Sequence, residues 1–326
     1  MRVLILGTYE EQKNIRNFEG LMSHYIIRAL RNKGVELSFV DVSNCLFMSD
    51  NEVEVFFREA DLKNSEHIIA LGLRFFDKIS PICLRILRER HSGTICQFYD
   101  GGILNGPAVD ATFTFRDDSW RYPLNSPNNR HERFHNSNFY VGWAADSMLF
   151  SSNQNDDVLR VLVDHTSYDD SGWDISVFIL QSLRTMVQSN VWKKRFKGVQ
   201  IRQIVEGGVR DVDLNNICIT AYGMNKIPIK KIAEEYSKSH LFMVTHKESL
   251  GISALEAAVA GGLPVIPAGF IPLDRTKTFR NFEYSEKINW EMVINCIDCK
   301  KSRSMSIDNS WNKLVDNVVS LLKSMT

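Results

Sequence analysis

Short apolar runs alternate with helical patterns along the whole chain. Runs at residues 2–7, 67–73 and 94–99 are bounded by polar or turn residues, which is typical of buried strands. Residues 24–33 and 81–90 carry apolar positions at helical spacing, and Gly34 gives the first of these helices its expected stop. Further strands are predicted at 35–42 and 111–115. Alternation of this kind predicts a parallel α/β architecture.

The same alternation begins again after a polar segment, SSNQNDD, at residues 151–157. Its predicted strands lie at 158–165, 199–205, 217–223, 240–246 and 263–267, and its predicted helices at 173–188, 229–239 and 253–262. A last helix is predicted at 310–325. We therefore expect a first α/β domain at 1–150, a linker near 151–157, a second α/β domain at 151–309, and a C-terminal helix at 310–326 that caps one of the domains.

Composition narrows the choice of partners. Lys plus Arg and Asp plus Glu each count 39, so no net positive field favours nucleic acid as a partner.

No apolar run approaches the roughly 18 residues of a membrane span, and the N-terminus turns polar too early for a signal peptide. We expect a cytoplasmic protein, with peripheral association with a membrane left open. Cys296 and Cys299 have the spacing of half a zinc site, but no second pair lies near them in sequence.

Residues 247–266 carry the strongest functional signal, because Glu248 and Glu256 flank a predicted helix start. In one interpretation Ser253 is the N-cap of an S-x-x-E capping box, Glu256 is its partner, and Glu248 is an exposed loop acid. In the other, the amides and partial positive charge of the helix N-terminus hold a diphosphate, and Gly251 lets the backbone approach it. Glu256 then binds ribose hydroxyls and Glu248 reaches a transferred sugar.

A family resemblance supports the second interpretation. The run ESLGISALE at 248–256, followed by AAVAGGLPVI at 257–266, resembles the E-x7-E signature of retaining GT-B glycosyltransferases of the family 4-like group. Residues 20–40 are similar to the loop, helix and second strand that open these proteins, with Gly20 and His24 in the corresponding places. Where many members carry His-Asp, this chain has Tyr99 and Asp100. The resemblance implies a GT-B fold, in which two Rossmann-like, doubly wound domains face each other across a cleft.

The resemblance also implies roles for individual residues. Glu248 is the candidate catalytic residue that orients the sugar, and Asp100 is a second candidate that contacts the sugar or the acceptor. Members of the group usually have an Arg and a Lys after the first strand of the second domain, whereas this chain reads DHTSYDDSGWD at 164–174. Other groups must then balance the diphosphate charge. The candidate donor-binding residues are Glu256, Lys247, Ser249, Leu250, Gly251, Ile252, His165, Thr166, Gly20 and Gly207.

The implied reaction is a retaining transfer from a nucleotide-sugar to a hydroxyl group of a glycan, a lipid, a protein or another acceptor. Neither a cofactor nor a metal is expected, because helix amides and basic side chains hold the diphosphate in this type of site. The acceptor surface is expected on the first domain, around residues 8–19 and 101–138.

Other functions stay open at this point. A sugar-nucleotide epimerase or hydrolase can use the same frame, and the missing Arg and Lys favour a non-catalytic sugar-nucleotide or glycan-binding protein. Thr166 and Ser167 have an alternative interpretation as ordinary loop residues. A dinucleotide oxidoreductase is disfavoured, because the chain reads GTYEEQ after its first strand and lacks G-x-G-x-x-G.

Overall fold

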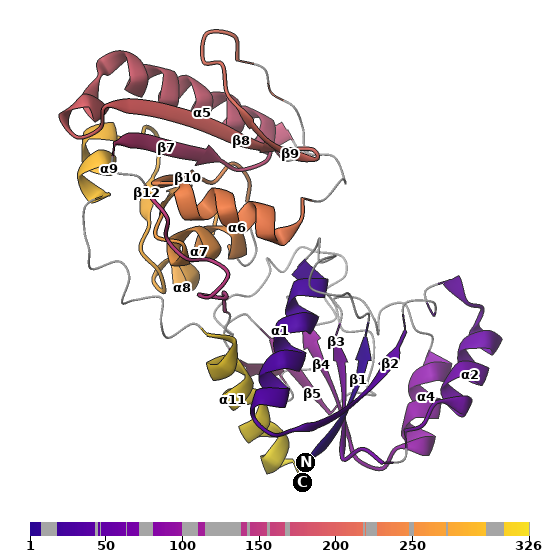
Figure 1. Cartoon of the computed structure of the whole chain (residues 1–326). Coiled ribbons are helices and arrows are strands. Elements are labelled where there is room, and N and C mark those ends of the chain that lie inside the picture. Colours follow the sequence, from indigo (N-terminus) through magenta and orange to yellow (C-terminus); the bar gives the residue numbers. More distant parts are fainter. Residues whose placement is uncertain are drawn as a thin grey trace. The chain divides into compact units, whose positions relative to one another are not determined.

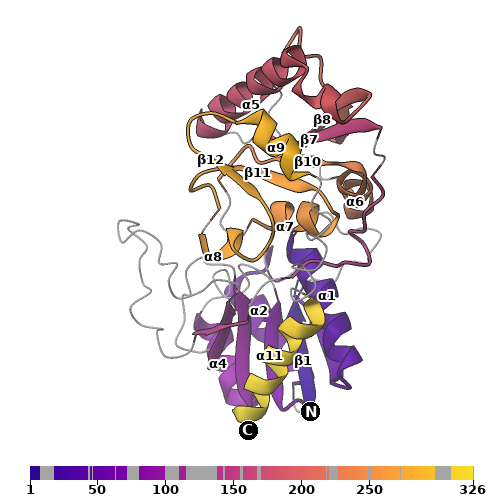
Figure 2. The ribbon, with the colours of Figure 1, turned by 90° about the vertical axis from the view of Figure 1, so that its left-hand side faces the viewer.

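The protein forms two compact units, and each is described by itself. The structure is a computed structural model that describes residues 1–7, 18–42, 45, 47–62, 64–71, 81–99, 110–114, 138–141, 144–154, 157–166, 170–217, 219, 227–247, 251–271, 273–297 and 310–325. The first unit comprises Met1–Trp143 together with Trp311–Thr326, and the second comprises Ala144–Ser310. Figures 1 and 2 show the ribbon in two views.

The first unit is built on a parallel sheet of six strands in the order β2-β1-β3-β4-β5-β6. The strands are β1 (Arg2–Gly7), β2 (Glu36–Asp41), β3 (His67–Leu71), β4 (Thr94–Tyr99), β5 (Ala111–Thr114) and β6 (Asn138–Tyr140). All five residues of β3 are buried, as expected for a central strand covered on both faces. β6 is a strand that the apolar pattern did not predict.

Helices cover both faces of this sheet (Figure 1). They are α1 (Phe18–Asn32), α2 (Asp50–Glu59), α4 (Pro81–Arg90) and α11 (Trp311–Ser324). α2 and α4 share one core with alternate residues of β1 and β3, whereas α1 and α11 lie side by side on the opposite face. Gly20, expected in a loop, lies within α1, because the helix begins at Phe18.

The C-terminal helix α11 returns to the first unit. The Trp311 and Tyr25 rings stack with centroids 5.3 Å apart, and Asn317 donates from Nδ2 to the carbonyl of Val141 at 3.2 Å. Lys33 and Asp316 form an ion pair at 2.6 Å. The helix that ends the sequence therefore packs on the domain that begins it.

The second unit has a mixed sheet in the order β12-β11-β10-β7-β8-β9. The strands are β7 (Val158–Val163), β8 (Gly198–Val205), β9 (Gly208–Asp211), β10 (Leu241–Met243), β11 (Leu263–Pro267) and β12 (Phe282–Tyr284). β9 runs antiparallel to β8 through a tight turn at Gly207, whose φ is 74°. This hairpin was not predicted, and most of the strand expected at 217–223 lies outside the described residues.

Helices again flank the second sheet on both sides (Figure 2). They are α5 (Asp170–Ser189), η4 (Val191–Lys194), α6 (Ile229–Lys238), α7 (Ile252–Val259), α8 (Leu273–Thr276) and α9 (Trp290–Cys296). α5, η4 and α9 form one large core with β7, β10 and β11. On the other face, the aromatic ring of Tyr236 in α6 contacts those of Phe150 and Phe242.

The start of the expected linker is tied to the second unit. The amide of Asn153 donates to the carbonyl of Ser237 at 2.7 Å, and Gln154 donates from Nε2 to the carbonyl of Ser239 at 2.7 Å. Both acceptors lie at the end of α6. The two units meet in the chain at Trp143 and Ala144, upstream of this segment. Among the described helices, none has the length and apolar character needed to cross a bilayer.

Candidate functional site

The candidate site lies where the chain order reverses in the second sheet. β7 is the first strand of its unit. Its neighbours in the sheet are β8, which follows it in the chain, and β10, which comes after β9. Ligands of doubly wound proteins bind at the carboxyl ends of the strands at such a switch point. The residues there are Asp164, His165 and Thr166 after β7, and Thr245 and His246 beyond β10.

Asp164 is the centre of a compact polar cluster. Its side chain is 2% exposed, and its Oδ1 accepts from the backbone amide of His165 at 2.8 Å and from the Nδ1 of the same residue at 3.0 Å. Its Oδ2 lies 3.8 Å from the Nδ1 of His246. The rings of the two histidines have centroids 4.3 Å apart. A buried carboxylate and two imidazoles therefore share one small volume.

The two histidines favour the ionised form of the Asp164 carboxylate. Burial by itself would raise the pKa of Asp164, but the nearby His165 and His246 outweigh burial, so the pKa lies below its usual value. Within the described part of the chain, Asp164 forms ion pairs with these two histidines and with no Lys or Arg. An ionised buried carboxylate needs a compensating positive charge nearby. The imidazoles of His165 and His246 are the described groups closest to it.

Hydroxyl groups fix the loops that carry the histidines. The Thr245 hydroxyl, fully buried, donates to the backbone carbonyl of His165 and so joins the loop after β10 to the loop after β7. The Thr166 hydroxyl donates to Ser176 Oγ at 2.9 Å and accepts from Gln203 Nε2 at 3.2 Å. Thr166 is fully buried, so its side chain supports the loop from within.

α7 begins beside this cluster. Its N-cap is Gly251, with φ 65°, and its helical residues start at Ile252. A side chain at position 251 would place Cβ 2.7 Å from Ile271 Cγ2, so both the backbone conformation and the packing require glycine. Ser253 is already the second helical residue, and its Oγ donates to Asp164 Oδ2 at 3.4 Å. The start of the helix is thereby linked to the Asp164 carboxylate.

This geometry overturns the capping-box interpretation of Ser253 and Glu256. Because the helix starts two residues earlier than that interpretation requires, Glu256 falls in its second turn, and the N-cap residue Gly251 forms no side-chain cap hydrogen bond. Glu256 is 5% exposed. A carboxylate at this depth is not an ordinary solvated helix residue, since charged side chains are rarely buried without a partner.

The structure brings only some of the predicted donor-binding residues together. His165, Gly251, Ile252 and Glu256 lie at the loop after β7 or in the first turns of α7, and Lys247 is exposed just before α7. Gly207 lies in the β8–β9 turn of the same unit, and Gly20 lies in α1 of the first unit. The remaining candidates lie outside the described residues: Asp100, Glu248, Ser249 and Leu250.

Asp164 and His246 were not predicted as site residues from the sequence. Each is a polar residue that follows a buried strand, which was visible in the sequence. Their meeting depends on β7 and β10 being neighbours, and that pairing connects segments far apart in the chain. A search for polar residues after strands expected at a switch point would have found both.

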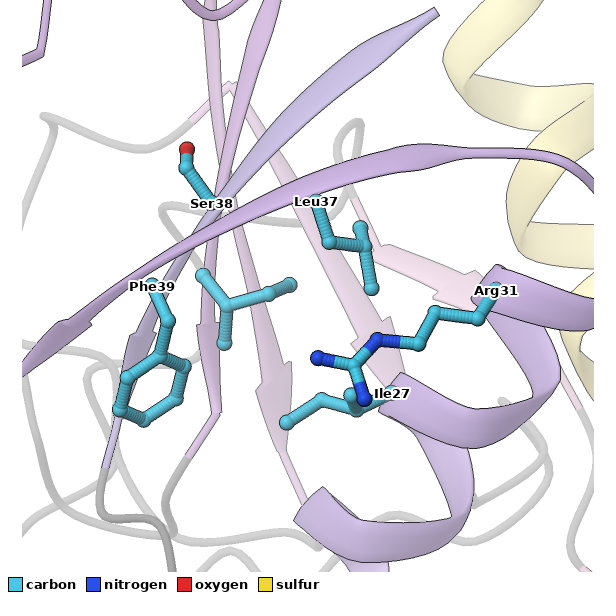
Figure 3. A pocket seen from close by; sticks show the side chains of 6 residues that line it. Ile27, Arg31, Leu37, Ser38 and Phe39 are labelled. Atoms are coloured by element: carbon cyan, nitrogen blue, oxygen red, sulfur yellow. The ribbon is translucent and has the colours of Figure 1, made fainter.

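A separate pocket lies in the first unit between α1 and the edge strand β2. It encloses about 240 Å³ and is lined by Ile5, Ile27, Arg31, Leu37, Ser38 and Phe39. Figure 3 shows the Arg31 guanidinium reaching into this hollow from α1. The described residues of its lining carry aliphatic and aromatic groups, the Ser38 hydroxyl and one cation, and none of them is a carboxylate or an imidazole. The Asp164 cluster supplies both of these groups.

Comparison with solved structures identifies the fold. An α,α-trehalose-phosphate synthase (UDP-forming) from Burkholderia vietnamiensis matches with a TM-score of 0.59 at 11% identity, over 99% of this chain and 97% of that chain. A glycosyltransferase from Rickettsia africae ESF-5 matches with a TM-score of 0.58 at 11% identity, over 99% and 98% of the two chains. A putative UDP-N-acetylglucosamine 2-epimerase from Listeria monocytogenes matches with a TM-score of 0.57 at 9% identity, over 99% and 96%.

The sequence by itself finds no such relatives: no protein-family model matches it, and no curated protein sequence matches it. At identities of 9% to 11%, structural likeness establishes architecture rather than activity. The prediction of two Rossmann-like α/β domains is confirmed, and the chain has a fold of the GT-B type.

Proposed function

We propose that this protein is a glycosyltransferase that moves a sugar from a nucleotide-sugar to an acceptor hydroxyl with retention of the anomeric configuration. The observation that carries the proposal is the convergence of the α7 N-terminus with Asp164, His165 and His246 at the carboxyl ends of β7 and β10. The GT-B fold and its glycosyltransferase neighbours agree with this assignment.

The donor diphosphate fits the start of α7. The first amides of a helix have no acceptor within the helix, and they carry a partial positive charge that favours an anion. Gly251 brings the backbone into position there, Lys247 precedes it on the surface, and His165 is partly exposed beside it. These groups take the place of the Arg and Lys that the resemblance led us to expect.

Glu256 is proposed to hold the ribose. It already has an interaction within the protein, but a carboxylate offers about four acceptor positions, so some remain for the paired hydroxyls. Glu248 is proposed to orient the sugar, and Asp100 to contact the sugar or the acceptor. Both are assigned from the family resemblance, since they lie outside the described residues.

The proposed reaction needs no nucleophile from the protein. The bond between the anomeric carbon and the phosphate oxygen breaks while the acceptor oxygen bonds to the same carbon from the same face. The acceptor proton passes to the leaving diphosphate. The protein contributes orientation and electrostatic stabilisation of the charge that develops on the diphosphate. The acceptor is proposed to be a hydroxyl of a glycan, a lipid, a protein or another molecule, and the site of action is proposed to be the cytoplasm.

A sugar-nucleotide epimerase is the second candidate, because a putative UDP-N-acetylglucosamine 2-epimerase shares the fold over nearly the full length of both chains. The two functions bind the same class of donor and differ in the product. An epimerase returns an altered nucleotide-sugar, whereas a transferase releases the nucleoside diphosphate.

Thermal unfolding with a panel of UDP-, GDP-, ADP- and CMP-sugars tests the proposed donor site. A ligand that binds only the folded state at 100 times its Kd adds about 2.7 kcal/mol of stability. We expect one nucleotide-sugar to stabilise the protein, and Glu256→Gln to weaken its binding about ten- to a hundredfold, as for the loss of a hydrogen bond to a charged group. The matched control is Glu286→Gln, an exposed acid of the same unit.

The outcome separates the candidate functions. Stabilisation that both variants retain would remove Glu256 from the donor site. Binding without release of a nucleoside diphosphate across a broad acceptor panel would identify a non-catalytic binding protein. A response to none of the nucleotide-sugars would remove the main support for the proposal.

A further inference from the structure

We propose that Asp164, His165 and His246 form a binding site for a divalent first-row transition metal such as Zn²⁺ or Co²⁺. The three side chains offer one ligand atom each, and these atoms all lie within 4.8 Å of one another. The site is a property of the free chain, so it does not depend on the proposed glycosyl transfer. It departs from the expectation drawn from the sequence, in which no metal was included.

The distances between the ligand atoms suit a small cation. A tetrahedral ion with metal–nitrogen bonds of about 2.05 Å holds its ligand atoms about 3.3 Å apart. The contact between Asp164 Oδ1 and His165 Nδ1 is 3.0 Å, and that between Asp164 Oδ2 and His246 Nδ1 is 3.8 Å. The two contacts involve different oxygens of the carboxylate, and both distances are close to the tetrahedral edge.

The charge at the site favours a cation. Asp164 is buried, and among the described residues its ion-pair partners are the two histidines. A neutral imidazole carries a lone pair on its unprotonated nitrogen, so each ring can ligate a metal. A divalent ion bound by one carboxylate and two neutral imidazoles leaves one positive charge in excess.

The donor set selects the class of metal. Two imidazoles and one carboxylate are typical ligands of Zn²⁺, Co²⁺, Fe²⁺ and Ni²⁺, whereas Mg²⁺ and Ca²⁺ prefer sites made of oxygen. Three protein ligands leave at least one coordination position for water or another ligand, as in catalytic rather than structural zinc sites. The side chains of His165 and His246 are 31% and 16% exposed, so an ion can reach them from solvent.

Neighbouring hydroxyls support the ligands in the way that outer groups do at metal sites. Thr245 holds the backbone carbonyl of His165, and Ser253 donates to Asp164 Oδ2 at 3.4 Å. Because Ser253 belongs to the first turn of α7, a bound cation would lie next to the helix start where the diphosphate is placed. With the proposed donor site in place, its excess charge would add to that of Lys247 at the diphosphate.

Cobalt titration of the full chain without a histidine tag tests the proposal. We expect one Co²⁺ per chain, with a visible spectrum of nitrogen and oxygen ligands and no sulfur charge-transfer band. Zn²⁺ should displace the cobalt, and a large excess of Mg²⁺ should not. His165→Asn and His246→Asn should each weaken Co²⁺ binding by more than about tenfold, since even outer-shell changes cost that much. Thermal unfolding of each variant confirms that it is folded.

Two controls exclude other ligands. His24→Asn removes a half-buried histidine of the first unit, and Cys296→Ser removes the described cysteine of the C-x-x-C pair. Both should bind Co²⁺ as the native chain does. Absence of stoichiometric binding, binding that persists in both His165→Asn and His246→Asn, loss of binding in Cys296→Ser, or displacement by Mg²⁺ would each overturn the proposal. Titration without any nucleotide keeps its failure distinct from a failure of the proposed transferase activity.

Discussion

Replacing Gly251 by alanine perturbs the start of α7 in two ways that the structure separates. The residue has φ 65°, a conformation that costs an L-residue about 1–2 kcal/mol. The added Cβ would also lie 2.7 Å from Cγ2 of Ile271, which is 3% exposed. Overpacking of a core typically costs about 1–3 kcal/mol. We therefore expect Gly251→Ala to lower the free energy of unfolding of the second unit by about 2–5 kcal/mol.

Gly207→Ala is the matched control for this prediction. Gly207 has φ 74° in the same unit, but apart from its two chain neighbours no described residue has an atom within 4 Å of the Cβ it would gain. It should therefore show only the backbone cost of about 1–2 kcal/mol. Hydrogen exchange in β7 and β11 measures the opening free energy of this unit without assuming that the whole chain unfolds in one step. If Gly251→Ala costs no more than Gly207→Ala, the close packing of Ile271 on the helix start is refuted.

Three further predictions concern the first unit. Burial lowers the pKa of His67 below its usual 6.5. The stability contributed by the neutral, buried imidazole is therefore complete above pH 6.5 and is lost as the pH falls toward the folded-state pKa. The unfolding temperature should fall less between pH 7 and pH 5 in His67→Gln than in the native chain. Burial raises the pKa of Cys96 to about 12, so mass spectrometry should find it unlabelled by a maleimide in the folded protein, and rapid labelling would contradict its burial. Trp311→Ala should destabilise this unit by about 3–5 kcal/mol through the lost packing on Tyr25, with hydrogen exchange in β7 unchanged.

The alternation of apolar runs was enough to predict much of the fold. Helix α6 was expected at 229–239 and is found at Ile229–Lys238, and the strand expected at 263–267 is β11. These elements have strong local patterns, so tertiary contacts do not change them. The β8–β9 hairpin was missed because its second strand, Gly208–Asp211, has no buried residue and so leaves no apolar run in the sequence.

The S-x-x-E pattern occurs near the start of two helices, α2 and α7, but it forms a capping box at α2 and not at α7. The S-x-x-E pattern at 253–256 suggested a capping box, yet Gly251 starts that helix. The same pattern at 49–52 went unused, yet the amide and hydroxyl of Ser49 both donate to Glu52 Oε2 at 2.7 Å, at the start of α2. Ser49 has an extended backbone that can form a cap. The motif depends on backbone geometry, which four residue types do not determine.

The candidate site was predictable in part for a related reason. Gly251, Glu256 and His165 lie in stretches whose local pattern or family resemblance pointed to them. The cluster of Asp164 with His246 required the neighbouring positions of β7 and β10, which arise from the pairing order of the sheet. Local sequence shows which polar residues follow strands, but it does not show which strands pair.

Product analysis by NMR tests the central claim of glycosyl transfer most directly. The full chain is incubated with the nucleotide-sugar that stabilises it, in the presence of a panel of hydroxyl acceptors. Retaining glycosyl transfer predicts release of the nucleoside diphosphate and a new glycoside whose anomeric configuration matches that of the donor. Recovery of an epimerised nucleotide-sugar, or of the donor unchanged with every acceptor, would contradict it.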